Sequence, residues 1–188
     1  MEEGWENIPW LRPDARQIAE RCIALLCVAA STDFEPGHFS EWIEENGLWH
    51  AVSPNEHLLL TQPQSDKERI TASWRSEALV VLLWAIRKWD DLPSWNQQID
   101  IAELLRHVPA FGEPLGTFIA SANLRSEEEI DTVREEHHQA HWQVRDARIN
   151  GKPMPPDIEP GVIYERHYAF NWLIGYDNLS WDEMEVDT

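Results

Sequence analysis

The sequence places one carboxylate among residues that are expected to be buried. Trp74, Glu77 and Trp84 follow the spacing i, i+3 and i+10, so they share a face of the helix predicted for this region. An apolar environment raises the pKa of a carboxyl group, as in general acids, whereas a facing arginine keeps it ionised. We favour a structural ion pair for Glu77, with Arg145 or Arg166 as its partner, over a role as an acid.

Two histidines lie one helical turn apart. His137 and His141 have the spacing that lets two imidazoles bind one metal ion, but a zinc site needs a third protein ligand. The glutamate of the His-Glu-x-x-His motif is absent, because residues 138–140 are His-Gln-Ala. The two histidines also align with apolar Val133 and Val144. We therefore interpret them as packing residues at the edge of the core and predict no metal and no other cofactor.

A third polar group lies in the apolar segment near the C-terminus. Glu165, Arg166 and His167 precede Asn171, which cannot be buried without hydrogen-bond partners. No nucleophile accompanies this group, so we favour a polar network that fixes helix packing over the lining of a small pocket. No catalytic residue is assigned. The candidate residues for the polar network or pocket are Trp74, Glu77, His141, Arg145, Asp146, Glu165, Arg166, His167 and Asn171.

Apolar periodicity and helix-capping signals predict the elements that position these residues. Strand-like alternation is weak everywhere and is strongest over residues 48–52. The fold class is therefore mainly α: a single-domain multi-helix bundle over residues 1–188, with short irregular connections and irregular ends at 1–11 and 176–188. The predicted helices span residues 12–30, with Pro13 in the first turn, 38–45, 55–60, 65–88, 99–107, 115–122, 126–149 and 161–175.

The composition limits the kinds of partner. Lys and Arg number 15 and Asp and Glu number 34, which gives a formal net charge of −19. This charge repels phosphate backbones and anionic lipid headgroups, so we predict no nucleic-acid and no membrane partner. It favours encounter with a basic protein. The oligomeric state cannot be read from these data.

Compartment and aromatic content give two further expectations. The N-terminal residues lack the pattern of a signal peptide, and the longest apolar runs, 22–30 and 78–86, are too short to span a bilayer, which predicts a cytoplasmic protein. Cys22 and Cys27 diverge around one helix and are predicted to be reduced core residues.

The 11 tryptophans are spread over the chain and predict several packing layers. Trp142 lies opposite the apolar face of its helix, so we expect that helix to pack on two sides.

The C-terminal residues are acidic, and the established catalytic motifs are absent. The acidic side chains Asp182, Glu183, Glu185 and Asp187 could bind a divalent cation, but their spacing does not match an EF-hand. We favour a solvated tail, or one bound by arginines. The sequence contains no Gly-rich phosphate loop, no Gly-x-Ser-x-Gly motif and no paired Cys-x-x-Cys motif.

Several stretches, taken together, carry a resemblance that spans most of the chain. They are Glu20-Arg21 with the apolar run to Ala30, Trp74-Arg75-Ser76-Glu77-Ala78 with Leu83-Trp84-Ala85, His141-Trp142-Gln143-Val144-Arg145-Asp146-Ala147, Glu165-Arg166-His167-Tyr168-Ala169-Phe170-Asn171-Trp172-Leu173, and Trp181-Asp182 with Asp187-Thr188. In these stretches the chain resembles the domain of unknown function 4272 family, a bacterial group with no established activity. The resemblance implies a single helical domain and brings no catalytic residues.

Two functional hypotheses follow. The leading one is a small non-catalytic binding or interaction protein with an acidic surface, for example one that neutralises a basic protein as an immunity protein does. The alternative is an enzyme or small-ligand-binding protein whose polar pocket is formed by Glu77, His141, Arg145, Glu165, Arg166 and His167. A related hypothesis is that Glu77, Arg145, Asp146, Glu165 and Arg166 form one ion-pair network that joins three helices.

Overall fold

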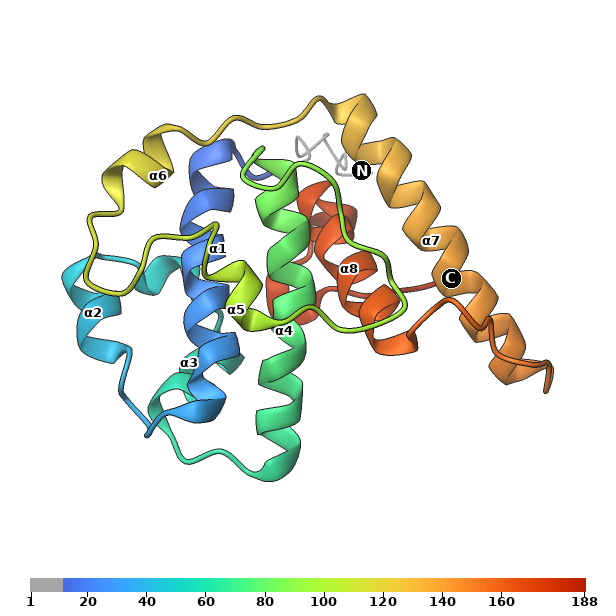
Figure 1. Cartoon of the computed structure of the whole chain (residues 1–188), viewed down its shortest axis with the longest axis horizontal. Helices are drawn as coiled ribbons and strands as arrows, with labels where there is room; N and C mark the ends of the chain where they lie inside the picture. The colour runs from blue at the N-terminus through green and yellow to red at the C-terminus, as the bar shows by residue number, and fades with distance from the viewer. Residues whose placement is uncertain (1–11) are drawn as a thin grey trace, which may run out of the picture.

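The computed structural model describes residues 12–188, and within them the mainly α fold is confirmed. These residues form helices and connections, with no strand. The α-helices, labelled in Figure 1, are α1 (Ala15–Ala30), α2 (Ser40–Glu45), α3 (Pro54–Thr61), α4 (Asp66–Ala85), α5 (Ile101–Leu104), α6 (Gly116–Ala120), α7 (Glu127–Ile149) and α8 (Pro160–Leu173). Short 3-10 turns occur at η1 (Ser31–Asp33), η2 (Trp49–Ala51), η3 (Tyr176–Asn178) and η4 (Trp181–Glu183).

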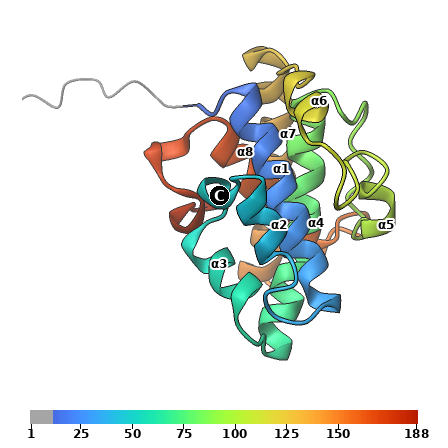
Figure 2. The same cartoon turned by 90° about the vertical axis from the view of Figure 1, so that its left-hand side faces the viewer.

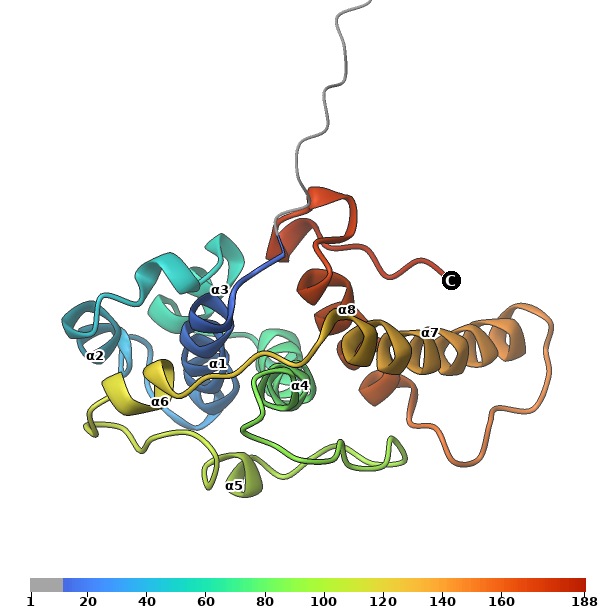
Figure 3. The same ribbon diagram turned by 90° about the horizontal axis from the view of Figure 1, so that it is seen from above.

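The four long helices lie side by side in the order α1, α4, α8, α7 (Figure 3). The central helix α4 packs against α1 on one side and α8 on the other, because its C-terminal half is apolar all round. Every residue of α4 from Ser76 to Ala85 is buried. Glu77 and Ser76 are the exceptions to an otherwise apolar run, so the fold must supply partners for them.

The short helices cover the outer side of α1 and one face of α4. The helices α3 and α6 contact α1, and α5 contacts α4 (Figure 2). Long connections join these elements, and residues 88–100 contain no helix. Side chains from the long helices hold that connection in place, as described below.

The helix starts follow the capping residues in the sequence. Capping boxes form at Ser53, Ser65 and Ser126, each with a glutamate three residues later. The start of α1 differs from our prediction: Asp14 is the N-cap and Gln17 completes the capping box. Pro13 therefore precedes the helix and is not in its first turn, because the side chain of Asp14 already accepts from the backbone N–H of Gln17.

Three other elements differ most from the sequence prediction. Residues 48–52, the best strand candidate, contain the 3-10 turn η2. The helix predicted over 99–107 shortens to Ile101–Leu104, followed by turns. The helix α4 ends at Ala85 instead of Lys88, and Arg87 adopts a left-handed conformation with φ of 57°. The predicted irregular end at 1–11 lies outside the described residues. The other one, 176–188, contains the two turns η3 and η4 and no α-helix.

Two predictions about individual side chains have different outcomes. Cys22 and Cys27 are buried and form no disulfide, and burial raises the pKa of the Cys27 thiol to about 12. The prediction for Trp142 was wrong, because this side chain is 48% exposed, and the long helix that α7 mainly packs against is α8. Among the described residues, no helix is both long enough and apolar enough to cross a membrane.

The close contact between α8 and α4 at Gly161 gives a first prediction. A Cβ atom at Gly161 would lie 2.6 Å from the Trp74 ring, so Gly161→Ala should lower the free energy of unfolding by about 1–2 kcal/mol. Gly116→Ala is the matched control, since a Cβ there would have no atom within 4 Å. Urea denaturation of both variants measures the difference. Equal stability of the two variants would show that the contact with Trp74 does not limit this position.

Candidate functional site

The buried pair of Glu77 and Arg166 connects α4 to α8. Arg166 Nε donates to Glu77 Oε2 over 2.8 Å, and neither residue is exposed. The predicted ion pair is therefore present with Arg166, and Arg145 is not a partner. The remaining polar atoms of both side chains bond the backbone of the 88–100 connection. The terminal nitrogens of Arg166 donate to the carbonyls of Pro93 (2.6 Å) and Ser94 (3.3 Å). Glu77 Oε1 accepts from the Ile99 N–H (2.5 Å).

A second pair connects the same two helices. Arg75 Nη1 lies 2.9 Å from Glu165 Oε2, and the guanidinium of Arg75 also lies over the Tyr168 ring, 5.0 Å from its centroid. Burial raises the pKa of Glu165 in spite of Arg75. Our candidate set contained Glu165 but missed Arg75. Its position two residues before Glu77, at the start of an apolar run, was the signal that could have identified it.

A third pair, between Arg21 and Glu56, was also missed. The two side chains form a bidentate pair with both N–O distances at 2.6 Å, and Arg21 also donates to the Ala51 carbonyl. Burial alone would raise the pKa of Glu56, but Arg21 lowers it below the ordinary value. Arg21 lies in the middle of the apolar helix α1, and this placement was the available signal. Its guanidinium lies over the Trp181 ring, 4.0 Å from the centroid.

The hypothesis of one network of five charged residues is therefore wrong in its connectivity. Arg145 points to the C-terminal segment, 3.5 Å from the Val186 carbonyl and 4.0 Å from Asp187. Asp146 pairs locally with Lys152 over 2.6 Å. Among the described residues, neither Arg145 nor Asp146 forms an ion pair with the buried charges of α4 and α8.

Asn171 and the acidic C-terminal segment are held by local hydrogen bonds. The Asn171 amide donates to the Glu185 carbonyl over 2.9 Å, and its Oδ1 forms no hydrogen bond with any residue that the structure describes. Asp182 accepts from Ser53 Oγ (2.6 Å) and from Asn55 N–H (2.8 Å) at the start of α3. The Tyr168 hydroxyl donates to the Trp181 carbonyl. The C-terminal segment is therefore attached to the helices, and Asp182 is not simply solvated.

The histidines separate into two environments. His141 and His167 form a hydrogen bond between their Nδ1 atoms over 3.0 Å, so one ring donates and the other accepts. His137 instead bonds the Val133 carbonyl over 2.8 Å, and its ring packs against Phe170. The description of His137 and His141 as packing residues agrees with these contacts. Among residues 12–188, no group of three or more His, Cys, Asp or Glu side chains is placed to hold a metal ion.

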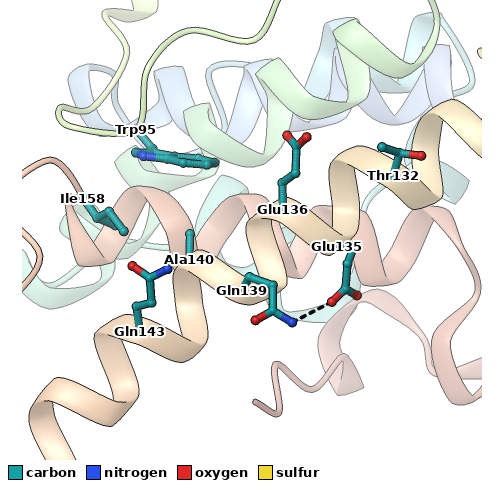
Figure 4. Close-up of a pocket in the computed structure, with 8 residues that line it drawn as sticks. All are labelled: Trp95, Thr132, Glu135, Glu136, Gln139, Ala140, Gln143 and Ile158. Atoms are coloured by element: carbon teal, nitrogen blue, oxygen red, sulfur yellow. Dashed lines mark hydrogen bonds between the residues drawn. The ribbon is translucent and has the colours of Figure 1, made fainter.

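Two hollows on the molecule lie away from these candidate residues. The first, of about 630 Å³, lies between α7 and the connections that contain Trp95 and Ile158 (Figure 4). The second, of about 660 Å³, lies between the start of α1, residues 50–54 and the C-terminal segment from Trp172 to Glu183. None of the candidate residues lines either hollow. The sequence did not identify these hollows, because their walls come from segments distant in the chain.

These features define a mainly α-helical domain whose long helices are joined by buried ion pairs. The family model described as "Domain of unknown function (DUF4272)" matches residues 6–184, and the chain belongs to this family. Comparisons with curated proteins and with solved structures gave no match.

The Glu77–Arg166 pair gives a prediction for stability. Glu77→Gln leaves the Arg166 charge buried without a counter-charge, so the free energy of unfolding should fall by roughly 3–5 kcal/mol. Glu103→Gln, at an exposed position that forms no ion pair within residues 12–188, is the control and should change stability by less than about 0.5 kcal/mol. Urea denaturation of both variants provides the comparison. An unchanged midpoint for Glu77→Gln would mean that this pair does not stabilise the fold.

The buried histidines give a prediction for pH. Burial lowers the pKa of His137 and His141 to about 4 and that of His167 to about 3, from 6.5. The unfolded chain therefore takes up more protons than the native one as the pH falls below 6.5, and the free energy of unfolding decreases. We expect the urea midpoint to fall between about pH 7 and pH 5.

The variant that tests this effect is His141→Gln/His167→Gln, in which two amides replace the imidazole pair. Its midpoint should depend less on pH than that of the native protein, because two of the groups no longer titrate. His57→Gln alters an exposed histidine and should keep the native slope. Equal slopes for all three proteins would contradict the assignment.

Proposed function

We propose that this protein is a non-catalytic binding protein for a basic protein segment, and that the hollow beside α7 is the binding surface. The observation that carries the proposal is an apolar floor bordered by carboxylates, with no cationic side chain in the lining. The strongly negative net charge of −19 supports the same class of partner.

The length of the hollow suits a peptide segment. Its α7 wall is made by residues that recur at helical spacing between Thr132 and Gln143, which spans roughly 16 Å at 1.5 Å per residue. Trp95 and Ile158 lie opposite this wall, as Figure 4 shows. An amphipathic segment fits such a surface by placing its apolar side chains on the floor.

The floor has a fixed aromatic side chain. Trp95, Ala140 and Ile158 supply the apolar surface, and the Trp95 ring packs edge-on against His137 at 5.1 Å between centroids. The Trp95 carbonyl accepts from Glu159 N–H over 2.7 Å, which joins the two connections behind the hollow. A partly buried tryptophan held in this way is the kind of residue that contributes most binding energy at protein interfaces.

The acidic side chains Glu135 and Glu136 give the hollow its charge. Both are exposed, and Glu136 forms no ion pair with any residue that the structure describes. Glu135 accepts from Gln139 Nε2 over 2.7 Å and lies 3.7 Å from His138 Nδ1, so no arginine or lysine neutralises it by direct contact. Lysine or arginine side chains of a partner would find two available carboxylates here.

The alternative hypothesis, a catalytic or small-ligand pocket of Glu77, His141, Arg145, Glu165, Arg166 and His167, has less support. Glu77, Glu165 and Arg166 use their charges in buried pairs, and His141 and His167 bond each other. These groups line neither hollow. A reaction needs groups that can reach a substrate, whereas a binding protein needs an accessible surface such as the one beside α7.

The test uses a fluorescein-labelled amphipathic peptide of lysine and leucine, with fluorescence anisotropy as the measurement. Glu135→Gln/Glu136→Gln should weaken binding by about three- to tenfold, since each exposed charge contributes up to about 1 kcal/mol. Trp95→Ala should weaken it by about fivefold or more, because the apolar contact is lost. Higher salt should weaken binding to the native protein.

The matched control is Glu44→Gln/Glu45→Gln on α2, which changes the net charge by the same amount at exposed residues far from the hollow in the sequence. Binding by this variant should stay within about twofold of native binding. An equal loss in both double variants would mean that the peptide responds only to net charge, and the proposed surface would be wrong.

A further inference from the structure

The outer face of α7 carries a row of side chains at the spacing of a coiled-coil seam. The members of this row, which we call the outer seam, recur at alternating intervals of three and four residues and are Glu128, Asp131, Glu135, His138, Trp142, Arg145 and Ile149. None of the seven is buried. The buried residues of α7 lie on the opposite face of the helix, toward α8. Alternating intervals of three and four are typical of a helix face that meets a second helix.

Two large apolar side chains of the outer seam are exposed. Trp142 is 48% exposed, and Ile149, seven residues later on the same face, is 75% exposed. The helix α7 lies at the end of the row of long helices, as Figure 3 shows, and the long helix that it mainly packs against is α8. Exposed apolar side chains that gather on one face of an element indicate an interaction surface.

The charge of the outer seam changes sign along the helix. Its first half presents the acidic Glu128, Asp131 and Glu135, and its second half presents Arg145 between Trp142 and Ile149. One of the acidic residues, Asp131, also lies 3.6 Å from Arg12. A helix face with this polarity is complementary to a second copy of itself that runs antiparallel, whereas a parallel copy would bring like charges together.

The contacts that these charges make within one chain are long and exposed. Glu135 lies 3.7 Å from His138, and Arg145 lies 4.0 Å from Asp187, whose side chain is itself 75% exposed. Surface contacts of this kind contribute little to stability. The acidic residue next to Arg145, Asp146, is bound over 2.6 Å by a lysine of the turn after α7. Glu135 and Arg145 can therefore each form a closer pair with a partner.

We propose that the outer seam is the interface of a symmetric dimer, in which α7 helices of two copies of this chain pack antiparallel. A register that brings Arg145 to Glu135 of the partner subunit also brings Trp142 to His138 of the partner subunit, because each step along one helix is a step back along the other. The two-fold symmetry makes each of these contacts occur twice. The proposal does not rest on the function proposed above.

The net charge determines the conditions in which the dimer is measured. Two copies that each carry a charge of −19 repel one another at long range. At an ionic strength of about 0.15 M this repulsion is screened beyond roughly 8 Å, whereas contacts in the seam persist. A seam formed by one helix from each copy is small, so we expect a weak dimer.

The experiment is sedimentation velocity of the full chain at about 0.15 M salt, over concentrations from about 5 to 300 µM. The average mass should rise from the 21.9 kDa of one chain toward twice that value. Arg145→Glu and Glu135→Arg each place like charges opposite one another in both symmetric pairs. Each should raise the dissociation constant of the dimer by about tenfold or more.

The combined variant Glu135→Arg/Arg145→Glu is the decisive one. It restores both pairs with their signs exchanged, and its dissociation constant should return to within about threefold of the native value. The two positions are ten residues apart on α7, which is roughly 15 Å along the axis. Because they cannot pair within one helix, the restoration reports a contact between two chains.

Matched controls separate the seam from general charge and general exposure. Arg106→Glu and Glu44→Arg make the same changes of charge at exposed positions outside the seam and should leave the dissociation constant within about twofold. Trp142→Ala should raise it by about tenfold, because a tryptophan at the centre of an interface contributes much of the binding energy. Ile70→Ala alters an exposed apolar residue of α4 and should have no such effect. Thermal melting followed by circular dichroism shows that the variants are folded.

Three results would overturn the proposal. They are a native protein that keeps the mass of one chain at every concentration, a combined variant that dimerises as weakly as its single variants, and controls that weaken the dimer as much as the seam variants do. A monomeric native protein would leave the peptide proposal intact. Glu135 borders both surfaces, but the peptide test also measures Trp95→Ala with a cationic probe, and Trp95 does not belong to the seam.

Discussion

The Glu77–Arg166 ion pair is the interaction on which the arrangement of the central helices depends. A carboxylate inside the apolar half of α4 has to meet a counter-charge, and Arg166 of α8 supplies it. The pair therefore fixes which faces of α4 and α8 meet. Because both residues also bond the backbone of residues 93–99, the same interaction orders a connection that has no helix of its own.

The other two buried pairs follow the same arrangement. In each case an arginine on a long helix pairs with a glutamate of another helix, and its remaining surface contacts a carbonyl or an aromatic ring. Arg21 donates to a carbonyl of η2 and lies over the Trp181 ring, and Arg75 lies over the Tyr168 ring. These charges hold connections and the C-terminal segment against the helices. They are consequently used inside the molecule.

The sequence predicted the helices well, because their signals are local. The capping boxes at Ser65 and Ser126 and the apolar run of α4 lie within a few residues of the positions that they determine. The site was predicted only in part. Arg166 was named as a partner of Glu77, but the Arg21–Glu56 pair joins residues 35 positions apart, and no local pattern connects them. The exposure of Trp142 depends likewise on which helices cover α7, which periodicity within α7 cannot show.

The hollow beside α7 differs from the buried pairs in the charges that it leaves accessible. Glu77, Glu56 and Glu165 pair with arginines inside the fold, whereas Glu135 and Glu136 are exposed and contact no lysine or arginine that the structure describes. These two carboxylates border the apolar floor of Trp95, Ala140 and Ile158. The buried charges thus hold the helices together, and the accessible ones are the groups on which our proposal of a cationic partner rests.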